Sequence, residues 1–372
     1  MPTDSDPLSP ARTGVASLPA AIALLLLVAA CGPTAATREV YTFEGRAMGT
    51  STTVKVAGAG LSESRQDAIR RMIEDQLELV NSKMSTYLES SELSRFNQSR
   101  ETTPFAFSRE SVTVFEQARA IGEASQGAFD ITVGPLVNAW GFGPPKNPPK
   151  TLTEDEISGL RDHTGWDKIQ IDAAASTVRK LDPEVYCDLS AIAKGYAVDL
   201  VSETLAAAGY VEHMVEVGGE VRARGLNQAG QPWRIAIERP VENTSVVERI
   251  VPLKDLSMAT SGDYRNYYER DGMRLSHTIN PRTGQPVNHR LASVSVIDPS
   301  CMRADGYATA IMALGETEGY ALAERENLAA LLIVRDGKGG FIEKASTEFE
   351  KLFPTGQFQQ NKPTVEGEPT PQ

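Results

Sequence analysis

The sequence predicts an α+β fold in which mixed or antiparallel sheets are flanked by helices. Strand-like segments outnumber helices in the second half of the chain, and no strand–helix alternation repeats along its whole length, as a parallel α/β sheet would require. The chain contains neither G-x-G-x-x-G after a strand nor G-x-x-x-x-G-K-[ST], so a Rossmann or P-loop domain is not expected. With 372 residues, 41% of them hydrophobic, it can bury a large core.

The N-terminal segment is expected to be a processing signal and a tether. Residues 18–30 form an apolar run that is too short to span a bilayer comfortably and has the length of a signal-peptide core. The run ends in Val-Ala-Ala-Cys-Gly, which resembles a bacterial lipoprotein box with Cys31 as the lipidated first residue of the mature chain. We therefore expect a signal peptide at 1–30, a tether at 31–38 and a membrane-anchored lipoprotein that faces the periplasm. Because few basic residues precede the run, a plain signal anchor stays open as the alternative.

Extended and helical patterns follow each other in the first half of the remaining chain. Residues 41–56 read as extended and alternate in polarity toward their end, whereas residues 62–83 carry apolar side chains at helical spacing. Thr153 and Glu156 form a capping box, which predicts a short helix that ends before Gly165. The other expected elements of this half are a helix at 111–125, a loop at 140–149 and strands at 168–172 and 177–181.

Strand patterns dominate the second half, after a helix that starts near Ser190. Apolar side chains recur along this helix at helical spacing, and Gly209 offers a stop. Beyond 354 the chain is polar and rich in proline, so we expect a folded domain at 39–354 and a disordered tail at 355–372. The expected strands are 211–217, 220–224, 233–238, 250–253, 291–297, 329–334 and 341–342, with a hairpin at 264–277 turning at 271–272 and a helix at 303–314 closed by Gly315.

The charge balance narrows the range of partners. A formal net charge of -12 argues against nucleic acid, and an anionic substrate would need a local cation or a metal ion. The four histidines are scattered rather than spaced as a zinc cluster, and there is no H-E-x-x-H or G-x-S-x-G motif. Besides Cys31, the chain has Cys187 and Cys301. They could pair in an oxidising compartment or stay two buried thiols that never meet.

The stretch at 188–199, Asp-Leu-Ser-Ala-Ile-Ala-Lys-Gly-Tyr-Ala-Val-Asp, is where we expect the chemistry. Lys194 falls in the first turn of a helix that Ser190 can cap, and a cation there opposes the positive end of the helix dipole. A bound phosphate would offset that charge. Asp188, just before the helix, would repel the phosphate unless a divalent cation stood between them. The alternative is an exposed lysine and an aspartate that caps or flanks the helix.

Asp305 and Thr309 form a second candidate group, because residues four apart share one face of a helix. Carboxylate and hydroxyl oxygens suit Mg²⁺ or Ca²⁺, and Mg²⁺ usually completes its shell with water and substrate phosphate. In the alternative, Asp305 is an ordinary N-terminal helix charge and Thr309 a packing residue. His277 lies between two turn signals and is a candidate general base, although a lone histidine is also consistent with hydrogen-bonded structure.

Several stretches occur in an order that resembles the FAD:protein FMN transferases, the ApbE-type periplasmic flavin transferases. Glycines at 49, 127, 218–219 and 262 let main-chain amides approach a phosphate or a ring edge but also mark ordinary turns. In one departure, the family usually follows its histidine with Ile or Val and then Ile-Asp-Pro, whereas Thr278, Ile279 and Asn280 precede Pro281 here. The matching stretches are Met48-Gly49-Thr50, Met84-Ser85-Thr86-Tyr87, Ser91-Glu92-Leu93-Ser94-Arg95-Phe96-Asn97, Phe129-Asp130-Ile131-Thr132-Val133-Gly134-Pro135-Leu136, Trp140-Gly141-Phe142-Gly143, Asp188 to Asp199, Val217-Gly218-Gly219-Glu220, Thr260-Ser261-Gly262-Asp263-Tyr264, and Ala304-Asp305 through Thr309-Ala310.

The resemblance implies an ApbE-like fold with a flavin site and a magnesium site. The implied Mg²⁺ ligands are the carbonyl of Ala191 with the side chains of Asp305 and Thr309. His277, Lys194 and Asp305 are the implied catalytic residues. The residues expected to contact FAD are Met48, Tyr87, Ala128, Phe129, Asp130, Asp188, Lys194, His277 and Ile279.

The resemblance also implies a reaction. The FMN moiety of FAD is moved onto a threonine or serine hydroxyl of an acceptor protein through a phosphoester bond, with Mg²⁺ as cofactor and AMP as the leaving group. Flavin-bearing subunits of membrane redox complexes are the implied acceptors. Two other functions stay open: a Mg²⁺-dependent FAD pyrophosphatase that gives free FMN and AMP, and a lipoprotein that binds FAD without chemistry.

Overall fold

The computed structural model describes residues 38–144, 151–241, 246–264, 267–270 and 273–354. The predicted signal peptide, Cys31, nearly all of the predicted tether, the C-terminal tail and the expected turn at 271–272 lie outside the described residues. Within the described part of the chain, no helix combines the length and hydropathy that crossing a bilayer requires.

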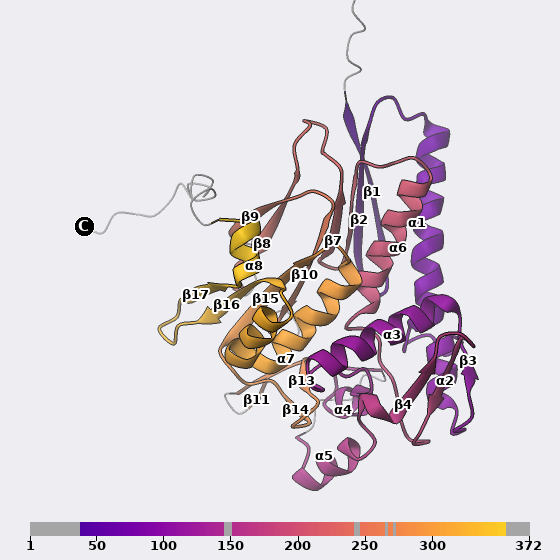
Figure 1. Ribbon diagram of the computed structural model, residues 1–372, viewed down its shortest axis with the longest axis vertical. Helices are drawn as coiled ribbons and strands as arrows, with labels where there is room; N and C mark the ends of the chain where they lie inside the picture. Colours follow the sequence, from indigo (N-terminus) through magenta and orange to yellow (C-terminus); the bar gives the residue numbers. More distant parts are fainter. Residues whose placement is uncertain (1–37, 145–150, 242–245, 265–266, 271–272, 355–372) are drawn as a thin grey trace, which may run out of the picture. The chain divides into compact units, whose positions relative to one another are not determined.

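An eight-stranded antiparallel sheet forms the middle of the domain (Figure 1). Its strand order is β1-β2-β6-β7-β10-β15-β16-β17, so the hairpin of the first two strands lies at one edge. The strands are β1 (Glu39–Ala47), β2 (Thr50–Gly58), β6 (His213–Val217), β7 (Glu220–Arg224), β10 (Leu256–Gly262), β15 (Leu291–Asp298), β16 (Ala329–Arg335) and β17 (Phe341–Ala345).

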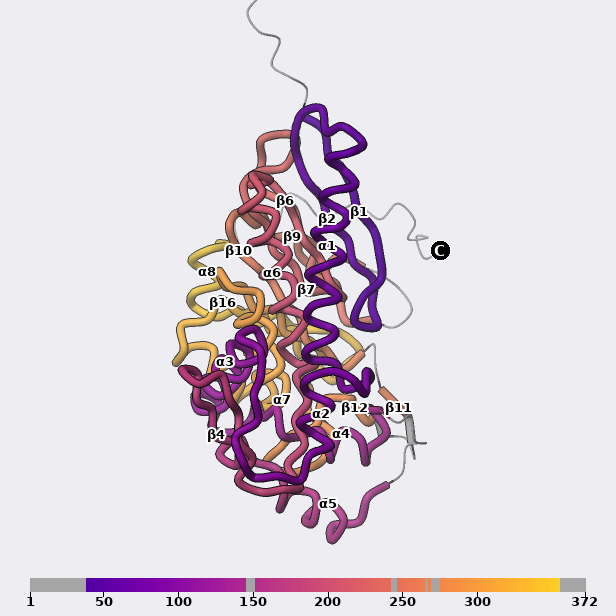
Figure 2. Tube along the Cα trace, turned by 90° about the vertical axis from the view of Figure 1, so that its right-hand side faces the viewer, coloured from indigo at the N-terminus to yellow at the C-terminus, as the bar shows by residue number. Residues whose placement is uncertain are grey.

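Helices cover one face of this sheet. Helices α1 (Glu63–Met84), α6 (Ala193–Ala207) and α7 (Cys301–Arg325) pack there, and Figure 2 shows α1 running alongside the β1–β2 hairpin. The apolar stripe of α1, which the periodicity predicted, is buried against the sheet through side chains such as Ile69 and Leu77. Helix α3 (Arg109–Ala124) joins the same hydrophobic core.

A second layer covers the other face of the sheet. It consists of the hairpin β8 (Trp233–Glu238) and β9 (Val247–Leu253) with helix α8 (Thr347–Leu352). Strand β16 shows why the sheet has two cores: Leu332 faces the helices, whereas its neighbours Leu331 and Ile333 face the hairpin. Alternation along a strand thus fills both layers.

The remaining elements lie together at the lower end of the domain in Figure 1, beyond the N-terminal end of α6. A small sheet of order β3-β5-β4 and two short hairpins, β11–β12 and β13–β14, lie here (Figure 1). The elements are α2 (Glu92–Gln98), β3 (Phe105–Ala106), α4 (Gly134–Ala139), α5 (Glu154–Arg161), a 3₁₀ turn at Trp166–Lys168, β4 (Ile169–Asp172), β5 (Thr177–Lys180), β11 (Tyr267–Arg270), β12 (Met273–Ser276), β13 (Ile279–Asn280) and β14 (Gln285–Pro286).

The predicted α+β class is confirmed, and the sheets are antiparallel. The capping box at Thr153 also forms, with both of its hydrogen bonds present. Two details differ. Helix α6 begins at Ala193 with Ile192 as its cap residue, because the amide of Ser190 turns back to the carboxylate of Asp188 instead of starting the helix.

The second difference concerns α7. The expected helix at 303–314 does stop at Gly315, whose φ of 79° and ψ of -173° lie outside helical values, but a further helical segment follows it as far as Arg325. Glycine is tolerated there because the conformation costs it little. The two cysteines of the body, Cys187 and Cys301, are both buried and unpaired.

Candidate functional site

A cavity of about 1150 Å³ lies where the starts of α6 and α7 meet the turns after β1 and β6. These elements come from distant parts of the sequence, and the antiparallel sheet brings their ends together. Every residue that the sequence singled out for FAD, metal or catalysis lines this one cavity. They are Met48, Tyr87, Ala128, Phe129, Asp130, Asp188, Ala191, Lys194, His277, Ile279, Asp305 and Thr309.

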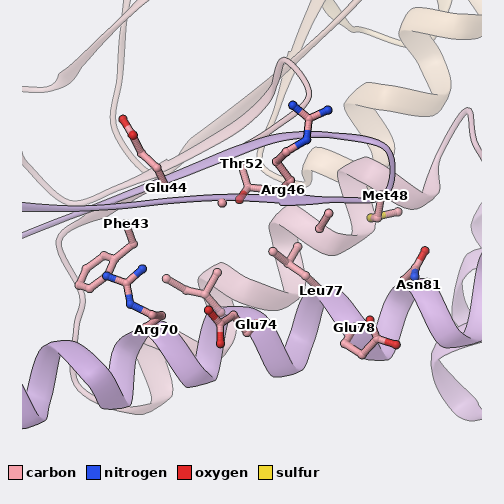
Figure 3. A pocket seen from close by; sticks show the side chains of 13 residues that line it. Phe43, Glu44, Arg46, Met48, Thr52, Arg70, Glu74, Leu77, Glu78 and Asn81 are labelled. Atoms are coloured by element: carbon pink, nitrogen blue, oxygen red, sulfur yellow. The ribbon is translucent and has the colours of Figure 1, made fainter.

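A smaller pocket of about 360 Å³ lies beside the cavity, between β1 and α1 (Figure 3). Its walls carry charged side chains such as Arg46 and Glu78, and the guanidinium of Arg70 lies 5.6 Å from the centre of the Phe43 ring. Of the predicted site residues it contains only Met48. The chemistry is therefore expected in the larger cavity.

Helices α6 and α7 come into direct contact at Gly195. Its amide donates a hydrogen bond of 3.0 Å to Oδ2 of Asp305. A Cβ atom at this position would lie 2.4 Å from the carbonyl oxygen of Cys301 and 2.8 Å from Cβ of Asp305. Glycine is therefore needed for the two helices to approach this closely.

This contact also frees a carbonyl group. In a regular helix the amide of Gly195 would bond to the carbonyl four residues earlier, on Ala191, but here it bonds to Asp305. Among the described residues, no hydrogen-bond donor reaches the Ala191 carbonyl. This oxygen at the cavity wall is thus available to a ligand.

Lys194 sits between two carboxylates. Its Nζ lies 2.9 Å from Oε1 of Glu220 and 3.7 Å from Oδ2 of Asp305. The sequence argument expected a bound anion to offset this charge, whereas the chain itself supplies two carboxylates. Glu220 was not singled out from the sequence as a partner of Lys194; the only signal was its place after Gly218 and Gly219 at the start of β7.

Burial governs the ionisation of this cluster. It raises the pKa of Asp305 and of Glu220, partly offset by the charge of Lys194. Burial alone would lower the pKa of Lys194, but the two carboxylates outweigh it and raise that pKa, so the lysine stays charged. Oε2 of Glu220 is buried without a hydrogen-bond donor among the described residues. The cluster thus holds an orphaned acidic oxygen beside the cavity.

Thr309 lies one turn beyond Asp305 on α7, at the sheet side of the cavity. Its hydroxyl is 3.4 Å from that of Ser261 on β10. Cys301 and Asp305 are both buried at the start of α7. Helix α7 thus contributes the carboxylate of Asp305 and the hydroxyl of Thr309 to the cavity wall. The described residues contain no cluster of three or more His, Cys, Asp or Glu suited to a metal. One carboxylate, one hydroxyl and one carbonyl do fit a hard cation that takes its other ligands from water and phosphate.

Asp130 holds the glycine-containing loop that precedes α4. Its Oδ1 accepts hydrogen bonds from the amide and hydroxyl of Thr132, at 2.8 and 2.6 Å, and its Oδ2 accepts one from the amide of Trp166 at 3.0 Å. The residue is 8% exposed, and burial raises its pKa. The amide of Asp188 donates to the carbonyl of Ile131 at 2.7 Å. Asp130 therefore fixes a loop that is attached directly to the stretch before α6.

The mouth of the cavity carries a turn and an aromatic ring. Met48 and Gly49 connect β1 to β2 with φ values of 50° and 77°, as a type I′ turn requires. Tyr87 is 65% exposed. A flat, exposed ring and a thioether that line the same cavity both suit contact with a planar heterocycle.

His277 follows β12 on the opposite side. Its ring is half-buried and lies 6.4 Å from that of Phe142, edge to face. The next segment is tied to α7, because the side-chain amide of Asn280 donates to the carbonyl of Ala313 at 3.2 Å. Asn280 thus ties the segment that follows His277 to α7.

Comparisons with known proteins agree with this architecture. The family model described as the ApbE family matches residues 48–332. An FAD:protein FMN transferase of Vibrio cholerae is 46% identical over 334 residues, which cover 90% of this chain and 98% of that protein. One of Haemophilus influenzae is 43% identical, covering 90% and 97%.

Solved structures lead to the same family. The flavin transferase ApbE from Vibrio cholerae superposes with a TM-score of 0.78 at 45% identity, over 85% of this chain and 99% of that chain. The flavinyl transferase ApbE from Pseudomonas stutzeri in its apo form gives a TM-score of 0.77 at 39% identity, over 85% and 97%. By sequence and by fold, this chain belongs to the ApbE family.

Proposed function

We propose that this chain is an enzyme, an FAD:protein FMN transferase. It moves the FMN moiety of FAD onto a threonine or serine hydroxyl of an acceptor protein through a phosphoester bond and releases AMP. The observation that carries the proposal is the meeting of all twelve predicted site residues in one cavity of about 1150 Å³. The name shared by the relatives from Vibrio cholerae and Haemophilus influenzae supports it.

The donor set supports Mg²⁺ as the cofactor. Asp305 would hold it through the oxygen that Gly195 leaves free, together with the hydroxyl of Thr309 and the carbonyl of Ala191. When bound, the ion neutralises charge on the diphosphate and on the leaving AMP. Lys194 adds a positive charge beside Glu220 and Asp305, which reduces the repulsion between these carboxylates and a bound diphosphate.

The protein residues position the reactants and move one proton. The acceptor hydroxyl attacks the phosphorus on the flavin side of FAD. The bond between that phosphorus and the bridging oxygen breaks, and AMP leaves with the electron pair. His277 accepts the proton of the attacking hydroxyl, since it lines the cavity and a histidine titrates near neutral pH. Tyr87 and Met48, at the mouth, contact the planar part of the nucleotide.

One incubation separates this function from its two alternatives. The domain without its N-terminal signal is mixed with FAD, Mg²⁺ and a purified acceptor subunit of a membrane redox complex that does not yet carry its flavin, and the products are separated by liquid chromatography and mass spectrometry. A gain of one FMN on an acceptor threonine or serine, with AMP in equal amount, supports transfer. Free FMN with AMP would instead indicate a pyrophosphatase, and unchanged FAD a binding protein.

The proposed site of action is the periplasmic face of a membrane, with a lipid on Cys31 as the anchor. Its support is the apolar run at 18–30 followed by the lipoprotein-like box. Metabolic labelling with a radioactive fatty acid tests it. The full-length chain should carry label and sediment with membranes, and Cys31→Ala should lose the label. A variant that keeps the label would refute the anchor.

A further inference from the structure

Asp199 closes the 188–199 stretch, yet the proposed chemistry gives it no role. It lies on α6 one helical turn beyond Gly195, so both residues are on the face of α6 that meets α7. Its side chain is 14% exposed. Within the described part of the chain, its hydrogen bonds and ion pairs go to the start of α7 and to the neighbouring strand β7.

The Asp199 carboxylate caps the other helix. Oδ1 accepts a hydrogen bond from the amide of Cys301 at 2.9 Å, and Oδ2 accepts one from the amide of Met302 at 3.0 Å and one from the hydroxyl of Ser300 at 2.8 Å. The first amides of a helix have no partner within it, and a negative charge there is favoured by the helix dipole. Ser300 caps the next amide, of Arg303, at 3.2 Å. The start of α7 is therefore fixed by a residue of α6.

Strand β7 holds Asp199 in place. Nη1 of Arg222 lies 2.6 Å from Oδ1 of Asp199, and its Nη2 lies 2.9 Å from Glu203. Glu220, two residues earlier on the same strand, holds Lys194 at 2.9 Å. Residues two apart point to the same face of a strand. One face of β7 thus braces both the Lys194 end and the Asp199 end of this part of α6.

Two contacts one turn apart set how α7 lies against α6. The first joins Gly195 to Asp305, and the second joins Asp199 to the amides at 301 and 302. Asp305 and Thr309 follow on the same helix within two turns, while the Ala191 carbonyl precedes α6. A shift of the start of α7 would separate the oxygens that the two helices contribute.

We propose that Asp199 is a positioning residue of the ion site: by capping α7 from α6 it holds Asp305 and Thr309 in register with the Ala191 carbonyl. This inference rests on the proposed function, because that function defines the ion site. Groups that orient metal ligands typically change metal affinity by about 10- to 100-fold when they are replaced. Asp199 does not contact the reactants and acts through Asp305 and Thr309.

The test compares Asp199→Ala and the milder Asp199→Asn with the wild type. Binding of Mn²⁺ to the FAD-bound protein, without acceptor, is followed by electron paramagnetic resonance, and transfer is measured as a function of Mg²⁺ concentration. We expect the Mn²⁺ dissociation constant and the half-saturating Mg²⁺ concentration to rise about 10- to 100-fold in Asp199→Ala and less in Asp199→Asn. Saturating Mg²⁺ should restore most of kcat in both variants.

Ser108→Ala is the matched control for a purely structural effect. Ser108 caps α3 and lies outside the cavity, so its loss should lower the melting temperature without changing the Mg²⁺ requirement. The inference is overturned if the Asp199 variants melt earlier, as this control does, but keep the wild-type Mn²⁺ affinity. If Asp199→Ala does not fold, Asp199→Asn decides. A wild type that shows no Mg²⁺-dependent transfer would refute the proposed function instead, which is a separate result.

Discussion

The amide of Gly195 is hydrogen-bonded to the carboxylate of Asp305 at 3.0 Å, at a point where α6 and α7 leave no room for a Cβ atom. The contact places the proposed metal ligand against the start of the helix that carries Lys194. It also leaves the carbonyl of Ala191 without a donor among the described residues. The site therefore depends on glycine at position 195, since a side chain there would keep the two helices apart.

Gly195→Ala should disturb this arrangement. The new Cβ would lie 2.4 Å from a backbone oxygen of Cys301, which cannot rotate away as a side chain can. We expect a loss of about 1–3 kcal/mol in the free energy of unfolding and a weaker response to Mg²⁺. Urea denaturation with and without Mg²⁺ and FAD measures both.

Gly159→Ala is the control for this substitution, because a Cβ at that position of α5 meets nothing within 4 Å. It should leave stability unchanged or raise it by up to about 1 kcal/mol. If the two variants are equally stable and respond equally to Mg²⁺, the close approach of the helices at Gly195 is not needed for stability or for Mg²⁺ binding.

Asp305→Ala should abolish Mg²⁺-dependent transfer while the fold stays intact. Asp305 supplies the only carboxylate of the proposed ligand set, and its removal leaves a hydroxyl and a carbonyl, which bind Mg²⁺ weakly. Circular dichroism checks the fold, and the mass of the acceptor protein measures transfer. Full transfer by this variant in chelator-treated buffer would count against the metal assignment.

His277→Ala should still bind FAD but transfer FMN slowly. Loss of a general base typically costs about 100- to 10,000-fold in rate. Single-turnover mixing of FAD-bound enzyme with acceptor separates the rate of transfer from binding. His163→Ala is the control, since His163 pairs with Asp182 and does not line the cavity. Equal single-turnover rates in the two variants would remove His277 from the mechanism.

The pH dependence of stability should reveal the protonation of His213. This buried ring bonds to the hydroxyl of Ser202 and to the carbonyl of Tyr210, both at 2.7 Å, and burial lowers its pKa from 6.5 to about 4. Between these values the unfolded chain binds a proton that the folded chain does not, so stability falls as pH falls. The loss from pH 7 to pH 4 should reach about 3 kcal/mol.

Urea denaturation at several pH values tests this assignment, with His213→Asn as the comparison. The variant has no ring to protonate, so its stability should fall less steeply over the same interval. Parallel curves for the two proteins would show that another group is responsible for the loss.

The residues that line the cavity could be named from the sequence, because they lie in short motifs whose order along the chain can be read without the structure. The roles given to Met48, Tyr87, His277 and the other residues stay predictions. Periodicity also predicted the strands at 220–224 and 233–238 with their observed bounds. Alternation is a local property, so it is visible before folding.

Relations across the fold were not visible in the sequence. Strand β10 runs through Thr260, Ser261 and Gly262, which read as a turn, yet its neighbours β7 and β15 hold it in the middle of the sheet. Tertiary pairing outweighs the local preference there. In the same way, only the antiparallel sheet brings Glu220 to Lys194.

The proposed reaction requires that the diphosphate of FAD is held where α6 and α7 begin, by an ion bound to both helices. Crystals of the protein soaked with FAD and Mn²⁺ test this most directly, because the anomalous signal of Mn²⁺ locates the ion. We expect Mn²⁺ to be bonded to Asp305, Thr309 and the Ala191 carbonyl, with the FAD diphosphate and water completing its shell. A diphosphate found far from both helices would contradict it.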